Sequence, residues 1–193
     1  MRYEKGHKDA TRRRIVAVAA QQLRKDGLGA TGVAGLMARA GLTHGGFYSH
    51  FSSKDALIEE ALREATEQFK TWIAAETGGR SFEATIRAYL STTHRDNPES
   101  GCVAAALASE IARYSPAARE IFTQNINDYI EMLAALLPAS ATPEARRSAA
   151  TAIISSTIGM IQLARAVDDE KLSDQILESG VAACLSMARA ISS

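Results

Sequence analysis

The polar side chains whose types and spacing suggest a chemical role gather in residues 31–54. This segment predicts two short helices joined by a tight turn, with Gly41 ending the first and Thr43 capping the second. Phe47 and Phe51, four residues apart, mark the buried face of the second helix. Its other face carries hydrogen-bond donors and two residues without side chains. This arrangement predicts a helix-turn-helix that reads base edges in the major groove of DNA.

The helix-turn-helix interpretation assigns DNA-contact roles to particular residues. Tyr48 and Lys54 are expected to bind phosphates, and His44 is expected to reach a base edge or a phosphate. His50 has two interpretations, a DNA contact or a hydrogen bond inside the protein. The amino ends of helices are natural seats for phosphate groups. The full set of expected DNA-binding residues is Arg12, Arg13, Thr31, Thr43, His44, Gly45, Gly46, Tyr48, His50 and Lys54.

The charge distribution favours a nucleic-acid partner. The whole chain is balanced, with 22 basic and 22 acidic residues. Residues 1–54, however, contain ten Lys and Arg against three acids, a net charge of +7, whereas residues 55–193 have a net charge of −7. Such a dipolar chain steers its amino-terminal part toward phosphates. An accidental charge run on a solvated face is the alternative, and the helix-turn-helix spacing weighs against it.

The segment from Ala10 to Glu60 resembles the amino-terminal domain of TetR-type (TetR/AcrR) transcriptional regulators. One departure is the Gly45-Gly46 pair, where many members of that family have a Thr or a larger residue. The resemblance implies a homodimer that binds a pseudo-palindromic DNA operator, responds to a small-molecule effector and represses transcription. The matching residues are Arg12 to Arg14, Gly27, Thr31, Val33, Ala40-Gly41-Leu42-Thr43, Phe47-Tyr48-Ser49-His50-Phe51 and Ser53-Lys54-Asp55.

Helical periodicity continues through the rest of the chain, and no alternating strand pattern flanks a hairpin turn. We predict an all-α fold with a three-helix, helix-turn-helix head in residues 1–54. Residues 55–193 are expected to form a larger helical domain for ligand binding and dimerisation. About nine helices are expected: residues 9–26, two short helices within 31–51, and then 52–75, 81–94, 102–114, 116–137, 143–167 and 172–191.

Small residues recur at four-residue spacing in the last two predicted helices. Such a pattern lets helices approach closely, and two helices from each chain then make a four-helix interface. Packing within one chain is an equal alternative from the residues alone. The resemblance favours the dimer, because TetR-type proteins typically pair through their last two helices. The expected interface residues are Ile153, Ser156, Gly159, Met160, Leu163, Ile176, Gly180, Ala183, Cys184 and Met187.

A cavity for a mainly apolar small molecule is expected among the helices of residues 81–167, with a fully packed core as the alternative. Cys102 is a different kind of candidate sensor, because it opens a helix where the dipole lowers a thiol pKa. Its Gly-Cys context resembles electrophile- and redox-responsive TetR-type members, although a buried, unreactive thiol is the favoured alternative. The candidate cavity residues are Tyr89, Thr93, Cys102, Tyr114, Phe122, Asn125, Ile126, Thr157, Met160 and Gln162.

The sequence lacks the motifs that would indicate other classes of protein. The chain has no nucleophile elbow, zinc-ligand pair, phosphate loop or dinucleotide-binding motif, so we predict no enzyme activity, no cofactor and no metal site. No apolar run suits a signal peptide or a membrane span, and two widely separated Cys fit a reducing compartment, so a cytoplasmic protein is expected. A helical protein-interaction module and a small helical enzyme remain alternatives, and neither uses the basic amino-terminal region.

Overall fold

A computed structural model describes residues 5–30, 32–78 and 81–191 of the chain. Within these ranges the chain is helical and contains no strand, which confirms the predicted all-α class. No helix in the same ranges is long and apolar enough to cross a membrane. The elements are α1 (Lys5–Ala30), α2 (Val33–Arg39), the 3-10 helix η1 (His44–Ser49), α3 (Lys54–Thr77), α4 (Phe82–Tyr89), α5 (Thr92–Asp96), the 3-10 helix η2 (Pro98–Ser100), α6 (Val103–Ile111), α7 (Pro116–Ala135), α8 (Pro143–Ala166) and α9 (Glu170–Ala190).

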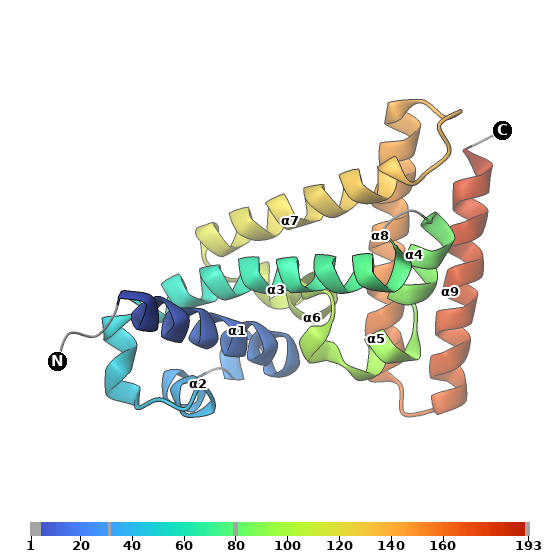
Figure 1. The fold of residues 1–193 in the computed structure, drawn as a ribbon. Coiled ribbons are helices and arrows are strands. Elements are labelled where there is room, and N and C mark those ends of the chain that lie inside the picture. The colour runs from blue at the N-terminus through green and yellow to red at the C-terminus, as the bar shows by residue number, and fades with distance from the viewer. Residues whose placement is uncertain (1–4, 31, 79–80, 192–193) are drawn as a thin grey trace.

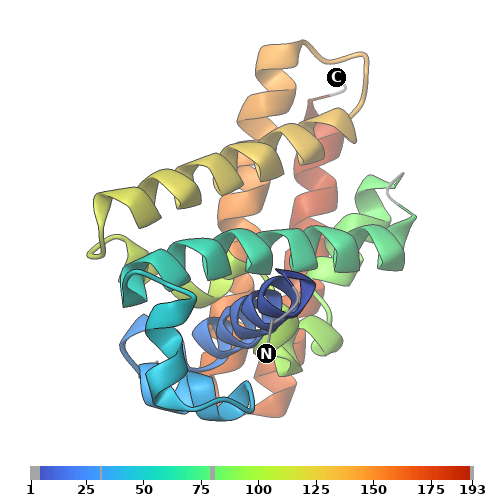
Figure 2. The same ribbon diagram turned by 60° about the vertical axis from the view of Figure 1, so that its left-hand side comes forward.

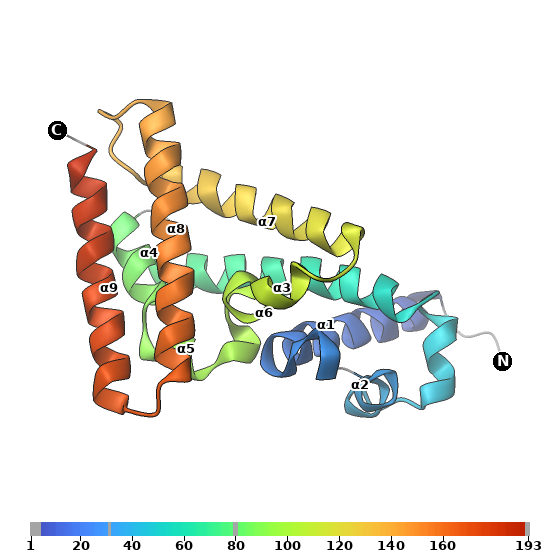
Figure 3. The same cartoon turned by 180° about the vertical axis from the view of Figure 1, so that it is seen from behind.

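Helix α3 is the long element that joins the two ends of the molecule (Figure 1). At one end it packs against α1, and α2 and η1 complete what we call the head. Helix α7 contacts α3 and runs along it (Figure 2). At the other end α8 and α9 form an antiparallel pair that stands across the ends of α3 and α7 (Figure 3). We call helices α4 to α9, with the adjoining end of α3, the body.

Two clusters of buried apolar side chains form the core. The head cluster includes Leu36 and Phe47, and it extends into α6 and the start of α7 through Leu107 and Ile121. The body cluster is built from α3 to α9 and includes Phe69. The head therefore packs directly on the body through α6, rather than being joined to it by α3 alone.

Side-chain caps set the start of several helices. The Ser53 hydroxyl accepts the N–H of Ala56 at 3.0 Å where α3 begins, and Ser115 and Thr142 cap α7 and α8 in the same way. Asp169 caps α9. These side chains satisfy amide groups that have no partner inside the helix, which fixes each boundary at a particular residue.

Gly27 ends the first regular stretch of helix, as predicted, because its backbone is non-helical (φ 85°), and a further helical turn then continues to Ala30. The prediction of one helix over residues 81–94 is wrong. The predicted helix 81–94 is two helices, since Leu90 leaves the helical conformation and the Ser91 side chain caps α5. In both places a local backbone break changes the direction of the chain without ending the helical region.

Candidate nucleic-acid interface and effector cavity

The second helix of the predicted helix-turn-helix is the 3-10 helix His44–Ser49, not an α-helix. The Gly pair lowers the α-helix propensity of this short segment, and the tighter 3-10 turn suits such short pieces. Phe47 and Phe51 are buried as predicted, with ring centroids 5.6 Å apart. Tyr48, between them, is 72% exposed. The element therefore presents one face to the head core and the other to solvent.

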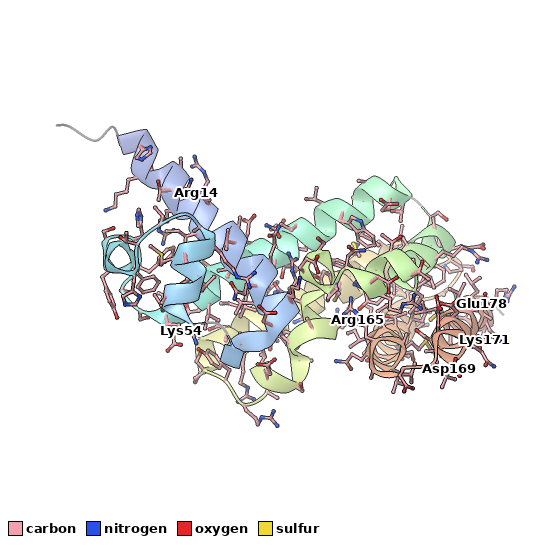
Figure 4. All side chains as sticks on the ribbon, turned by 90° about the horizontal axis from the view of Figure 1, so that it is seen from below. Arg14, Lys54, Arg165, Asp169, Lys171 and Glu178 are labelled. Atoms are coloured by element: carbon pink, nitrogen blue, oxygen red, sulfur yellow. The ribbon has the colours of Figure 1, made fainter. Side chains whose placement is uncertain are left out.

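The predicted DNA-binding residues that the structure describes lie in the head. Lys54 is at the start of α3, where its ammonium group donates to the Leu28 carbonyl near the end of α1 at 3.5 Å, and Arg14 lies farther back along α1 (Figure 4). Thr43 stands at the N-cap position of η1, but its side chain makes no capping hydrogen bond, contrary to our prediction. Thr31 lies outside the described residues. The exposed members are Arg13, Thr43, His44, Gly45 and Tyr48, and the half-buried members are Arg12, Gly46, His50 and Lys54.

Arg12 holds the head together, a role that sequence reasoning missed. Its guanidinium forms an ion pair with Glu60 of α3 and lies over the Phe51 ring, 4.7 Å from the centroid. Its Nε also donates to the His50 carbonyl at 3.3 Å. Burial, together with Lys8 and Arg12, lowers the pKa of His50, so that imidazole stays neutral near pH 7. Of the two arginines predicted to bind DNA, Arg12 is half-buried and Arg13 is exposed.

Helix α6 is hydrogen-bonded to the head by Glu110. The Glu110 carboxylate accepts the N–H groups of Leu28 at 2.8 Å and Gly29 at 3.4 Å. These amides follow the break at Gly27, where a Cβ would lie 2.6 Å from a Glu110 oxygen in a backbone conformation (φ 85°) that L side chains rarely adopt. The Glu110 carboxylate therefore caps the amino end of the short turn that follows Gly27.

A second tie between head and body involves Tyr114, just beyond α6. Its hydroxyl donates to a carboxylate oxygen of Asp55 on α3 at 2.6 Å. Burial and this acceptor raise the pKa of Tyr114 to about 12. Our placement of Tyr114 in the cavity is therefore wrong, because its polar end faces the start of α3.

Two buried basic residues form hydrogen bonds with the Gly101-Cys102 segment just before α6. Arg24 of α1 donates to the carbonyl of Ala65 at 2.8 Å and of Gly101 at 3.4 Å. The N–H of Cys102 donates to His94 Nε2 at 3.0 Å, and His94 Nδ1 donates to the Tyr89 carbonyl at 2.6 Å. Burial lowers the pKa of His94 to about 4, which keeps the ring neutral and able to accept. Sequence reasoning missed both Arg24 and His94, since neither belongs to a local motif.

A partly open cavity of about 40 Å³ lies between α3, α4, α7 and α8, with the N-cap residue of α6 in its wall. Three of the predicted cavity residues, Tyr89, Cys102 and Thr157, line it. The lining residues that the sequence did not indicate are Phe69, Ile73, Thr85, Ile86, Tyr129, Met132, Leu133, Ile154 and Ile158.

The other predicted cavity residues lie elsewhere in the body. Asn125 donates to the Thr66 hydroxyl at 2.6 Å, and Gln162 donates to the Ala105 carbonyl at 3.1 Å, so both amides serve packing between helices. Thr93 borders a separate surface depression beside Trp72. The remaining three pack in or beside the core clusters: Phe122, Ile126 and Met160. Helical spacing predicted that these residues face inward but not which neighbour each one meets.

The Cys102 thiol is buried, and burial raises its pKa. The amino end of a helix is expected to lower the thiol pKa, but burial disfavours the charged thiolate more strongly and raises it. The other cysteine, Cys184, is buried in the body core, with its pKa raised to about 11 by burial. Neither thiol has the exposed, electropositive surroundings of a reactive cysteine.

The outer face of α8 and α9 carries large apolar side chains exposed to solvent. Leu163 is 58% exposed, Met187 is 36% exposed, and Leu172, which the sequence analysis omitted, is 44% exposed. Three members of the predicted interface set are buried within the protomer: Ile153, Gly180 and Cys184. The partly exposed members of the predicted set are Ser156, Gly159, Met160, Ile176 and Ala183.

Known families match both parts of the chain. Residues 15–61 match the bacterial regulatory proteins of the tetR family, and residues 79–178 match the C-terminal domain of LmrA/YxaF-like transcriptional regulators. No curated protein sequence matches the chain.

Solved structures share the fold at low sequence identity. A TetR-family transcriptional regulator from Cytophaga hutchinsonii has a TM-score of 0.79 and 20% identity, and the alignment covers 98% of each chain. The reduced form of E. coli NemR has a TM-score of 0.73 and 20% identity, covering 91% of this chain and 95% of that one. A TetR transcriptional regulator from Legionella pneumophila has a TM-score of 0.73 and 23% identity, covering 90% and 94%.

The helical fold, the exposed η1 on a basic head and the family matches together define a helix-turn-helix regulator. The chain belongs to the TetR family of bacterial regulatory proteins. It is a DNA-binding transcriptional regulator, as the resemblance in residues 10–60 predicted.

Proposed function

We propose that this regulator is a dimeric repressor that releases its operator when a small molecule occupies the cavity. The observation that carries the proposal is the position of α6. Its N-cap residue Cys102 lines the cavity, whereas Glu110 near its other end and Tyr114 just beyond are hydrogen-bonded to the head. A ligand that widens the cavity therefore acts on the helix that holds the head. One conformation suits DNA and the other suits the ligand.

The switch is tested by measuring the two equilibria on the same protein. Operator DNA is first selected from random duplexes, and an effector is then found by screening small apolar compounds for DNA release. Coupling between the sites must be reciprocal, so the operator is expected to weaken effector binding by the same factor by which the effector weakens DNA binding. A compound that binds the cavity equally well with and without operator would contradict the proposal.

DNA contact by the head is tested with single substitutions. Tyr48→Phe and Lys54→Ala are expected to weaken binding to all duplexes alike, because phosphate contacts carry no base information. His44→Ala is expected to change preference at one or two base pairs, by about 1–3 kcal/mol for each lost base contact. Arg87→Ala is the matched control, since Arg87 pairs with Glu83 on the surface of α4. A change of preferred sequence in Lys54→Ala would contradict its assigned role.

The form of the operator follows from two heads related by a two-fold axis. We expect pseudo-palindromic half-sites separated by one helical turn of DNA or a multiple of it. Affinity is expected to fall steeply with salt concentration, since neutralised phosphates release counterions. Asymmetric selected sequences, or affinity that does not depend on salt, would count against this arrangement.

The exposed apolar face of α8 and α9 supports pairing through these helices. Gly159→Leu is the sharpest test, because a Cβ there would meet no atom of its own chain within 4 Å. This substitution is expected to leave the protomer folded and to yield monomers in light scattering. Gly180 is unsuitable, because a Cβ would lie 2.5 Å from the Met160 sulfur. Thr123→Leu, on the exposed surface of α7, is the control, and a normal Gly159→Leu dimer would move the interface elsewhere.

A thiol-based response through Cys102 is the competing switch, and burial of that thiol weighs against it. Thiol-reactive compounds are expected to leave the protein–DNA complex intact. If these compounds release DNA from the natural protein and not from Cys102→Ser, the proposed non-covalent switch is contradicted and a covalent switch at Cys102 is supported.

A further inference from the structure

Two tyrosines that line the cavity have buried hydroxyl groups that make no hydrogen bond of ordinary geometry in the described part of the chain. Tyr89 comes from α4 and Tyr129 from α7, and both rings meet the Phe69 ring edge-on, at centroid distances of 5.8 and 5.9 Å. Both hydroxyl oxygens are buried, and neither makes a hydrogen bond in the described part of the chain. The Tyr129 side chain as a whole is only 5% exposed. An unsatisfied buried hydroxyl costs about 1–3 kcal/mol, so an acceptor that reached either hydroxyl would be stabilised there.

The nearest polar neighbours of these two hydroxyls do not stand in ordinary hydrogen-bonding geometry to them. The Cys102 thiol lies near the Tyr89 hydroxyl, and sulfur is a weak acceptor. Near Tyr129, the Thr66 hydroxyl donates to the Leu62 carbonyl at 2.9 Å and accepts from Asn125 at 2.6 Å.

The remaining polar groups of the cavity wall are already engaged. The Thr85 hydroxyl donates to the Ser81 carbonyl at 2.9 Å, and the Thr157 hydroxyl donates to the Ile154 carbonyl at 3.0 Å. Apart from these groups and the two tyrosine hydroxyls, the wall is apolar, with no charged residue in it. A charged ligand would lose its hydration there without an ion partner, which is far more costly than burying a neutral oxygen.

Burial raises the pKa of both Tyr89 and Tyr129 well above the ordinary value of 10.0. The two phenols are therefore neutral donors at any physiological pH. The buried cations closest to this region direct their donors to backbone carbonyls: Arg24 to Ala65, and Arg165 to His94 at 2.6 Å. Neither arginine lines the cavity.

We propose that the cavity binds a small, uncharged and mainly apolar molecule through a carbonyl-type oxygen that accepts hydrogen bonds from Tyr89 and Tyr129. This inference rests on the effector-responsive function proposed above and names the chemistry of the effector. At about 40 Å³ the cavity has room for only a few waters, whereas benzene occupies an engineered protein cavity of about 150 Å³. The ligand must therefore push the wall apart, and the flexible Met132, 37% exposed, is the side chain best able to yield.

The test compares three probes of similar size by ligand-observed NMR titration of the whole protein. Acetophenone has a neutral acceptor, isopropylbenzene has none, and benzoate is charged. Acetophenone is expected to bind at least fivefold more tightly than isopropylbenzene and at least tenfold more tightly than benzoate. Equal affinity for acetophenone and isopropylbenzene, tightest binding by benzoate, or no saturable binding of acetophenone would overturn the inference.

Substitutions assign the hydrogen bonds. Tyr89→Phe and Tyr129→Phe are each expected to weaken acetophenone binding about 2- to 10-fold, the range of one neutral hydrogen bond, and to leave isopropylbenzene binding unchanged. Tyr114→Phe makes the same chemical change outside the cavity and is expected to leave acetophenone binding unchanged. Acetophenone binding that survives both cavity substitutions at full strength would overturn the assignment.

A parallel titration of the operator complex separates this inference from the proposed function. Tyrosine-dependent acetophenone binding that leaves DNA retention unchanged would contradict the effector-responsive switch and support the cavity chemistry. DNA release by a compound whose binding does not depend on Tyr89 or Tyr129 would support the switch and contradict the cavity chemistry.

Discussion

The head and the body of this regulator are packed in opposite ways. In the head, Met37 and Phe47 are completely buried, and the polar groups expected to contact DNA lie on the outside of η1. In the body, the core is interrupted by a cavity, and two of the residues that line it, Tyr89 and Tyr129, have buried hydroxyl groups without a hydrogen-bond partner. The head therefore exposes the polar groups expected to contact DNA, whereas the body buries the hydroxyl groups of two residues that line its cavity.

This difference matches two kinds of recognition. A duplex has a fixed shape, so a rigid support under η1 keeps the contact geometry without further ordering cost. A small molecule that enters the body must displace side chains, so the wall has to yield. Helix α6 belongs to both regions, because Leu107 packs in the head cluster and Cys102 lines the cavity. Under the proposed switch, an expansion of the cavity would therefore act on the head through α6.

The largest expected effect compares one methionine from each region. Met37→Ala, at a fully buried site under η1, is expected to lower the free energy of unfolding by about 2–5 kcal/mol because it leaves a void in a filled core. Met132→Ala, at the edge of the cavity, is expected to cost less than about 1 kcal/mol, because its side chain is already partly solvated. Urea denaturation measures both. Equal losses would remove the contrast between the two cores.

A pH-dependent loss of stability is expected from His94, at the junction of the regions. Its pKa is about 4 in the folded protein against an ordinary value of 6.5, so between these values the unfolded chain takes up a proton that the folded protein does not. Stability is therefore lost as pH falls through this window, by about 2 kcal/mol between pH 7 and pH 5. Urea denaturation at both pH values measures the loss. In His94→Gln the pH dependence is expected to shrink by that amount, and an undiminished dependence would assign it to other groups.

The contact between α6 and the head is expected to contribute less. Glu110→Gln replaces one carboxylate oxygen with a donor facing the amides of Leu28 and Gly29, and it is expected to lower the free energy of unfolding by about 1–2 kcal/mol. The variant is also expected to release DNA more easily. Glu83→Gln is the control, since its exposed pair with Arg87 within α4 is worth only about 0.3–0.5 kcal/mol. A loss no larger than that of the control would remove Glu110 as a link between the regions.

The smallest effect on stability is expected at Tyr48. With 72% of its surface exposed, Tyr48→Ala is expected to change the free energy of unfolding by less than about 0.5 kcal/mol. DNA affinity is nevertheless expected to fall, because the side chain lies on the outward face of η1. Thermal unfolding and fluorescence anisotropy with labelled operator separate the two effects. A large loss of stability would mean that Tyr48 supports the head core and does not only face DNA.

The head could be predicted from sequence because its parts are close together along the chain. Gly41 has φ 70° at the predicted turn, and Phe47 and Phe51 are buried as their spacing indicated. The sequence did not predict the long-range contacts of the head. The ion pair of Arg12 joins residues 48 positions apart, and no local pattern indicates Glu60 as its partner.

The body was predictable only as a class of structure. The sequence by itself determined that the chain is helical, where most helices begin and that a basic helix-turn-helix comes first, because caps, glycines and apolar spacing act over a few residues. Only the tertiary structure decided that Tyr129 lines the cavity and Asn125 does not, although both lie on α7 and face inward. That choice depends on how α7 is rotated against α3, α4 and α8. Such rotation is set by the packing of all four helices at once, which no single segment encodes.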